Sequence, residues 1–163
     1  MAEFKLPSEI IELPSKGLLY PEDSPLSEGK IEMKYMTAKE EDILTNQSYI
    51  RDGVVLDKLL KSLIVSKVNY NDLLIGDKNA IMVAARILGY GKDYTFRYSG
   101  GEETIDLSKV EPKPLHKAYK DTTENNFEFE LPASKNKITF KILTHSDETR
   151  LLKEIEGFKK IKK

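Results

Sequence analysis

The chain has 163 residues, 39% of them hydrophobic, which suits one domain with extensions because domains cluster at roughly 100–150 residues. Its 26 basic and 27 acidic residues almost cancel, and arginine occurs only at positions 51, 86, 97 and 150, so the charge argues against a protein that binds nucleic acid or an anionic membrane. The absence of cysteine excludes disulfides, thiolate zinc sites and cysteine nucleophiles, and it fits a reducing compartment.

The first feature along the chain is an apolar peptide, LPSKGLLYP, at residues 13–21. Pro14 and Pro21 disfavour a helical conformation of the residues before them, and Gly17 can supply a positive φ. We therefore predict an extended N-terminal arm over residues 1–27, which either folds back on its own domain or docks into a partner. Of these two, we predict that the arm docks into a partner. Its candidate partner-binding residues are Leu13, Pro14, Ser15, Lys16, Gly17, Leu18, Leu19 and Tyr20.

A strand and two helices are expected next. Apolar residues alternate with charged ones over residues 28–36, the period of a half-buried strand. Thr37 and Glu40 have the spacing of a capping box, which predicts a short helix that carries Ile43 and Leu44 inward. After Gly53 a second helix follows, with an apolar stripe at three- and four-residue steps. The stripe consists of Leu56, Leu59, Leu60, Leu63 and Ile64.

Residues 76–91, GDKNAIMVAARILGYG, predict a central helix that is apolar on nearly every side and therefore buried. Asp77 is the expected N-cap, and Gly89 is expected to end the helix in a left-handed conformation. Arg86 is either a structural clamp to Asp77, Asp72 or an acid of the first helix, or a binder of phosphate or carboxylate. We favour the clamp, because no second basic residue lies on that helix face. The structural residues predicted here are Asp77, Arg86, Gly89, Tyr90 and Gly91.

Two hairpins and a last helix complete the predicted elements. Tyr94, Phe96 and Tyr98 alternate before a turn at residues 99–101, and residues 104–107 return. This aromatic ladder suits sheet packing better than base stacking, because Arg97 is its only nearby arginine. Residues 111–125 read as a linker, and residues 127–131 and 138–142 as a second hairpin. A final helix opens at Ser146, with a stripe through Leu151, Leu152, Ile155, Phe158 and Ile161.

The predicted fold class is α+β: a small helical core at residues 28–110 with antiparallel β-hairpins, the extended N-terminal arm, and a hairpin plus C-terminal helix at residues 126–163. No catalytic group can be assembled, since His116 lies in the linker and His145 lies beside a helix start near Asp147. We therefore expect a protein without enzymatic activity, cofactor or metal. Neither a membrane span nor a signal peptide is indicated.

The succession of LPSKGLLYP, a strand ending in MTAKEEDILT, the central GDKNAIMVAARILGYG and the YTFRY strand resembles the baseplate hub protein family of T-even-type contractile-tailed bacteriophages. The resemblance runs from Leu13 to about Leu107, with an echo in FEFELP and ILTHSDE. Relatives often carry a cysteine pair at the turn after the aromatic strand, where this chain has Ser99, Gly100 and Gly101, so no metal is carried over. The family's chains tend to continue beyond the last helix, which leaves open whether Lys163 is a natural or a truncated end.

The resemblance implies a structural or assembly protein of the tail baseplate or hub, present in the host-cell cytoplasm during assembly. The implied partners are other phage baseplate or tail proteins, and homo-oligomerisation is left open. No nucleic acid is expected. The alternatives are a transient assembly chaperone absent from the mature virion and, less favoured, a nucleic-acid-binding module.

Overall fold

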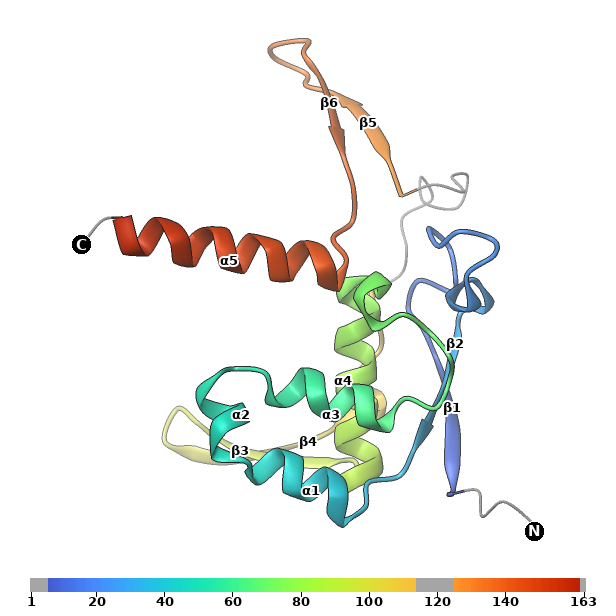
Figure 1. Ribbon diagram of the computed structural model, residues 1–163, viewed down its shortest axis with the longest axis vertical. Helices are drawn as coiled ribbons and strands as arrows, with labels where there is room; N and C mark the ends of the chain where they lie inside the picture. The colour runs from blue at the N-terminus through green and yellow to red at the C-terminus, as the bar shows by residue number, and fades with distance from the viewer. Residues whose placement is uncertain (1–5, 114–124, 162–163) are drawn as a thin grey trace.

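A computed structural model describes residues 6–113 and 125–161 (Figure 1). It has the predicted α+β architecture, with a C-terminal helix. The described helices are α1 (Ala38–Thr45), α2 (Gln47–Arg51), α3 (Val55–Leu63), α4 (Ile75–Tyr90) and α5 (His145–Ile161). Short 3-10 turns lie between β1 and β2 (η1, Pro25–Glu28), between α3 and α4 (η2, Tyr70–Asp72) and after β4 (η3, Leu107–Lys109). The described strands form three antiparallel pairs: β1 (Ser8–Glu12) with β2 (Lys30–Lys34), β3 (Asp93–Tyr98) with β4 (Gly101–Asp106), and β5 (Phe127–Glu130) with β6 (Lys137–Phe140).

The hydrophobic core forms where α3, β2 and the loop after β1 pack on α4. Leu59, Leu60 and Leu63 of α3 are buried, as are Ile31 and Met33 of β2, so the predicted strand and most of the predicted stripe are confirmed. Leu56 was assigned to the same stripe, but it is 47% exposed. Figure 1 shows α4 upright at the centre of the molecule, while α5 and the β5–β6 hairpin project from one end of it.

The sequence pattern predicts neither strand β1 nor the short helix α2. Residues 8–12 pair with β2 in a register that places Ile11 opposite Ile31. Ile10 is 68% exposed, and it adjoins Ile11 between Glu9 and Glu12 without the alternation of a half-buried strand, so only its pairing reveals this strand. The predicted extended arm is corrected accordingly: residues 8–12 are a strand of the domain, and the chain after them turns back over α4.

The capping box at the start of α1 is confirmed. The Glu40 carboxylate accepts hydrogen bonds from the Thr37 N–H at 3.0 Å and the Thr37 hydroxyl at 2.5 Å. It also accepts from Lys34 at 2.8 Å and from the Ser62 hydroxyl at 2.5 Å. Burial alone would raise the pKa of Glu40, but these hydrogen bonds outweigh it and hold the pKa at about 2. Glu40 therefore ties β2, α1 and α3 together as an ionised group.

Both ends of α4 differ from the prediction. The helix begins at Ile75, with Leu74 as N-cap and no side-chain cap, so Asp77 is the third residue of the helix. It runs through Gly89 to Tyr90 and ends at Gly91, whose φ is 81°. Gly89 instead leaves space for the Met36 side chain, because a Cβ at position 89 would lie 2.5 Å from the Met36 sulfur. The helix is also less buried than its composition suggested, since only Asp77, Ile81 and Ala85 are fully enclosed.

Both predicted hairpins are present. Ser99 and Gly100 form the two-residue turn of the first, with φ of 50° and 85°. The aromatic ladder belongs to the paired strand β3, as predicted, and Tyr94 stacks on Phe96. Tyr94 and Tyr98 are nevertheless 42% and 70% exposed, so the described residues do not enclose this face of the hairpin. The second hairpin begins inside the core at Phe127, which stacks on Phe140 with ring centroids 5.4 Å apart.

Candidate partner-binding surfaces

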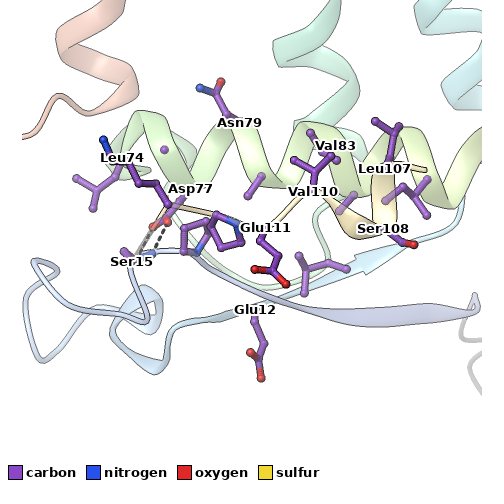
Figure 2. A pocket seen from close by; sticks show the side chains of 18 of the residues that line it. Glu12, Ser15, Leu74, Asp77, Asn79, Val83, Leu107, Ser108, Val110 and Glu111 are labelled. Atoms are coloured by element: carbon purple, nitrogen blue, oxygen red, sulfur yellow. Dashed lines mark hydrogen bonds between the residues drawn. The ribbon is translucent and has the colours of Figure 1, made fainter. Parts of the chain in front are cut away.

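The loop at residues 13–20, called the N-terminal loop below, is fastened to the first turn of α4 by Asp77 (Figure 2). One Asp77 oxygen accepts from the Ser15 N–H at 2.9 Å, and the other accepts from the Ser15 hydroxyl at 2.6 Å and the Tyr20 hydroxyl at 2.7 Å. The Tyr20 oxygen in turn accepts from the Leu74 N–H at 2.9 Å. Asp77 thus satisfies buried donors of the loop, and its charge lies at the helix end that favours an anion.

Most of the predicted partner-binding residues lie inside the protein's own core. Leu13, Leu19 and Tyr20 are buried in the hydrophobic cluster, and Ser15 and Gly17 are buried beside them. Pro14 and Leu18 are half-buried, and Lys16 is exposed. The loop therefore folds back on its own domain, and the docking interpretation is corrected for the buried residues. The physical reason is that the Asp77 carboxylate accepts hydrogen bonds from Ser15 and Tyr20, which stabilise the folded-back conformation.

Alkaline pH should weaken the fold through two buried tyrosines. Burial and the Asp77 carboxylate raise the pKa of Tyr20 far above 10, and burial and Asp57 raise the pKa of Tyr70 in the same way. Above pH 10 the unfolded chain releases both protons while the folded chain keeps them, so stability should fall by about 1.4 kcal/mol per pH unit for each tyrosine. Urea unfolding between about pH 9 and 11 measures the slope.

Each of Tyr20→Phe and Tyr70→Phe should remove roughly half of that slope, because each removes one of the two groups. Tyr98→Phe, at a position that is 70% exposed, is the matched control. A slope that is the same in wild type and in both buried variants would contradict the assignment.

Arg86 is a clamp, but its partners are not the predicted acids. Its guanidinium donates to the Gly91 carbonyl at 3.0 Å and contacts the Asp93 carbonyl at 3.5 Å. It also lies 5.2 Å from the Tyr90 ring centroid and 5.6 Å from that of Tyr94. Arg86 therefore fixes the exit of the chain from α4 into β3, and the expected pairing with Asp77, Asp72 or α1 is wrong because Asp77 faces the N-terminal loop.

Replacing Arg86 by Met should cost no more than about 1 kcal/mol, since the lost contacts are a carbonyl hydrogen bond and exposed cation–π pairs and no buried acid is left unpaired. Amide exchange in β3 should nevertheless become faster. Urea unfolding and hydrogen exchange of the same sample measure both effects. A loss of several kcal/mol would show that Arg86 satisfies a buried charge.

A polar cluster joins the first turn of α5 to the body. The buried His145 ring lies 3.5 Å from an Asp57 oxygen and 3.3 Å from the Lys78 nitrogen, and its edge meets the Tyr70 ring. Tyr70 donates to Asp57 at 2.9 Å, and Lys78 pairs with Glu148. The cluster fixes the direction in which α5 leaves α4. Asp147, two residues beyond His145, accepts from the Thr144 N–H and hydroxyl at the start of α5 and pairs with Lys141.

The described residues contain no group of three or more His, Asp or Glu side chains arranged to hold a metal. His116 lies outside the described residues. Among the described helices, none combines the length and the apolar content that a bilayer crossing requires.

An apolar groove of about 630 Å³ runs along α4, between that helix on one side and β1 and the chain after β4 on the other (Figure 2). It is called the α4 groove below. Most of its lining is apolar, and the exposed side chains of Glu12, Glu111 and Lys113 add two carboxylates and an ammonium group. Its apolar lining is Ile11, Pro14, Leu19, Leu74, Ala80, Val83, Ala84, Ile87, Leu107, Val110, Pro112 and Ile142.

Two further apolar faces lie on the projecting elements. On the β5–β6 hairpin, Phe129, Ile138 and Phe140 are 51%, 41% and 42% exposed. The predicted α5 stripe is also exposed over its described members, in contrast to a core-facing helix, and the Ile161 side chain lies outside the described residues. Its exposed members are Leu151, Leu152, Ile155 and Phe158, at 38%, 55%, 49% and 68%.

No protein-family model, curated protein or solved structure matches the chain.

Proposed function

We propose that the chain is a non-enzymatic structural or assembly protein of a contractile phage tail, working in the baseplate or hub through protein–protein contacts. The phage setting rests on the residues that resemble the baseplate hub family. The observation that supports binding to other proteins is the apolar face of the β5–β6 hairpin. This face begins in the core at Phe127 and continues outward through Phe129, Ile138 and Phe140.

A two-stranded hairpin is marginally stable in water unless another element packs on it. Phe129 and Ile138 are cross-strand partners and stand on the same face as the buried Phe127. Fully burying one such side chain contributes roughly 1.5–3 kcal/mol, so a partner that covers this face would extend the existing core. Contiguous exposed apolar residues of this kind are typical of protein–protein sites.

Mass spectrometry of purified particles beside infected-cell lysate tests the setting. A virion component should be found in both samples, whereas a transient assembly chaperone, which would make the same contacts, should be found in the lysate alone. Absence from particles and from tail-assembly intermediates would overturn the proposal.

Pull-down of tail proteins tests the hairpin face. Phe129→Ser combined with Ile138→Ser should abolish capture while leaving the melting transition of the body unchanged, because both residues are exposed. Glu128→Ser combined with Thr139→Ser, the neighbouring cross-strand pair, is the matched control. Capture should also tolerate added salt, since apolar docking releases few counterions, whereas binding to nucleic acid would fade steeply. Equal capture by the two double variants would contradict the role of this face.

A further inference from the structure

The apolar stripe of α5 has the spacing of a coiled-coil seam. Leu151, Ile155 and Phe158 follow one another at steps of four and three residues, which places Ile155 at an a position and the other two at d positions of a heptad. All three side chains are exposed, and Figure 1 shows α5 projecting from the end of α4. The described part of the chain therefore leaves this seam open to a partner.

Two opposite charges flank the seam. Glu154 occupies the g position on one side, and Lys159, five residues later, occupies the e position on the other side; both are exposed. In a parallel pair of helices, a g residue of one helix lies beside the e residue of the next heptad in the other. Glu154 of each copy would thus pair with Lys159 of its mate. The other charged side chains described beyond the first turn occupy the outer c, f and b positions: Arg150, Lys153 and Glu156.

An antiparallel pair of α5 helices lacks this charge match. Reversing one helix about the centre of the seam brings the g positions together, so Glu154 of one copy would face Glu154 of the other. Like charges at a contact are destabilising. A β-branched residue at a with leucine at d, as in Ile155 and Leu151, also favours two parallel strands. The seam and its flanks therefore favour the same arrangement.

We infer that α5 pairs with α5 of a second copy of this chain as a short parallel coiled coil. The contact is isologous, because the same face of each copy meets its equivalent across a two-fold axis. The seam is shorter than the roughly three to four heptads of a stable coiled coil, so dimerisation should depend on protein concentration. This inference goes beyond the proposed function, and a monomeric protein would leave the baseplate proposal standing.

Sedimentation velocity of the full chain, at concentrations up to millimolar, tests the pairing. The wild type should dimerise. Glu154→Lys and Lys159→Glu should each weaken dimerisation by roughly tenfold, because each variant places like charges on both flanks of the seam. An equimolar mixture of the two variants should associate as strongly as the wild type, since each copy then supplies the charge opposite to that of its mate.

Three further variants complete this experiment, with circular dichroism to confirm that each is folded. Lys153→Glu, on the opposite face of α5, is the matched control for charge reversal and should leave dimerisation unchanged. Ile155→Ser combined with Phe158→Ser should abolish it. Val83→Lys in the α4 groove should have no effect, and a loss of association there would show that the groove holds the partner instead. A monomeric wild type would overturn the inference, and so would charge variants that dimerise like the wild type.

Introduced thiols test the orientation, because the chain contains no cysteine of its own. Leu151→Cys and Phe158→Cys are mixed in equal amounts and oxidised in a glutathione redox buffer. In a parallel pair each position lies opposite its own equivalent, so disulfides should join identical positions, 151 to 151 and 158 to 158. Mass spectrometry of the cross-linked peptides measures the products. A share of mixed disulfides, 151 to 158, that equals or exceeds the matched ones would contradict the parallel coiled coil.

Discussion

Asp77→Ala is expected to lower the free energy of unfolding by roughly 3 kcal/mol or more, a large share of the stability of a domain of this size. The carboxylate accepts hydrogen bonds from the Ser15 N–H, the Ser15 hydroxyl and the Tyr20 hydroxyl, all in the buried interior. Removing it leaves these donors without an acceptor, and each unsatisfied buried donor costs about 1–3 kcal/mol. Urea unfolding of the purified variant measures the loss.

A double-mutant cycle with Tyr20→Phe separates this network from a general loss of packing. Because the two side chains are hydrogen-bonded at 2.7 Å, the double variant should lose less stability than the two single variants together. Asp23 is an exposed acid in the chain between β1 and β2, and the stability of Asp23→Ala should stay within about 0.5 kcal/mol of the wild type. Additive losses, or a small effect of Asp77→Ala alone, would show that the loop is not held by this carboxylate.

Gly17→Ala should be at least as damaging, for a steric reason. Gly17 has a φ of +80°, and a Cβ there would lie 2.0 Å from the Ser27 carbonyl oxygen and 2.8 Å from the Gly29 nitrogen. Both are backbone atoms, so neither can move aside as a side chain would. We expect a loss of several kcal/mol or displacement of the N-terminal loop from α4.

Gly53→Ala is the matched control for Gly17→Ala. Gly53 has a similar φ of +69°, but no atom lies within 4 Å of the added Cβ. Its loss should therefore be limited to the conformational cost of a left-handed residue, roughly 1–2 kcal/mol. Thermal melts of both variants isolate the steric part by subtraction. Equal losses of stability in the two variants would mean that the backbone around Gly17 shifts to accommodate the added Cβ without strain.

Sequence patterns succeeded where the signal and its partner are close together in the chain. The Thr37 and Glu40 capping box, the alternation through Ile31 and Met33, and the hairpin turn at Ser99 and Gly100 all depend on neighbouring residues, and all are present in the structure. The same holds for the start of α5, although its apolar stripe is uncovered rather than buried.

Contacts between distant residues could not be read from the sequence. Asp77 has the residue type of an N-cap, and only the start of the helix at Ile75 turns it towards Ser15 and Tyr20. His145 pairs with Asp57 across the fold rather than with its neighbour Asp147. The apolar N-terminal loop illustrates the limit best, because docking and folding back require the same residues and only the position of the Asp77 acceptor decides between them.

Native-state hydrogen exchange of the Ser15 and Leu74 amides tests most directly whether the N-terminal loop is a fastened part of the core. The Ser15 N–H donates to Asp77 and the Leu74 N–H donates to the Tyr20 oxygen, so both bonds exist only while the loop is in place. Both amides should exchange only through global unfolding, with the same free energy as the Ile81 amide inside α4. If the Ser15 and Leu74 amides exchanged as fast as the exposed amide of Gly100, the loop would leave α4 freely, and the interpretation of the loop as a docking arm would be correct.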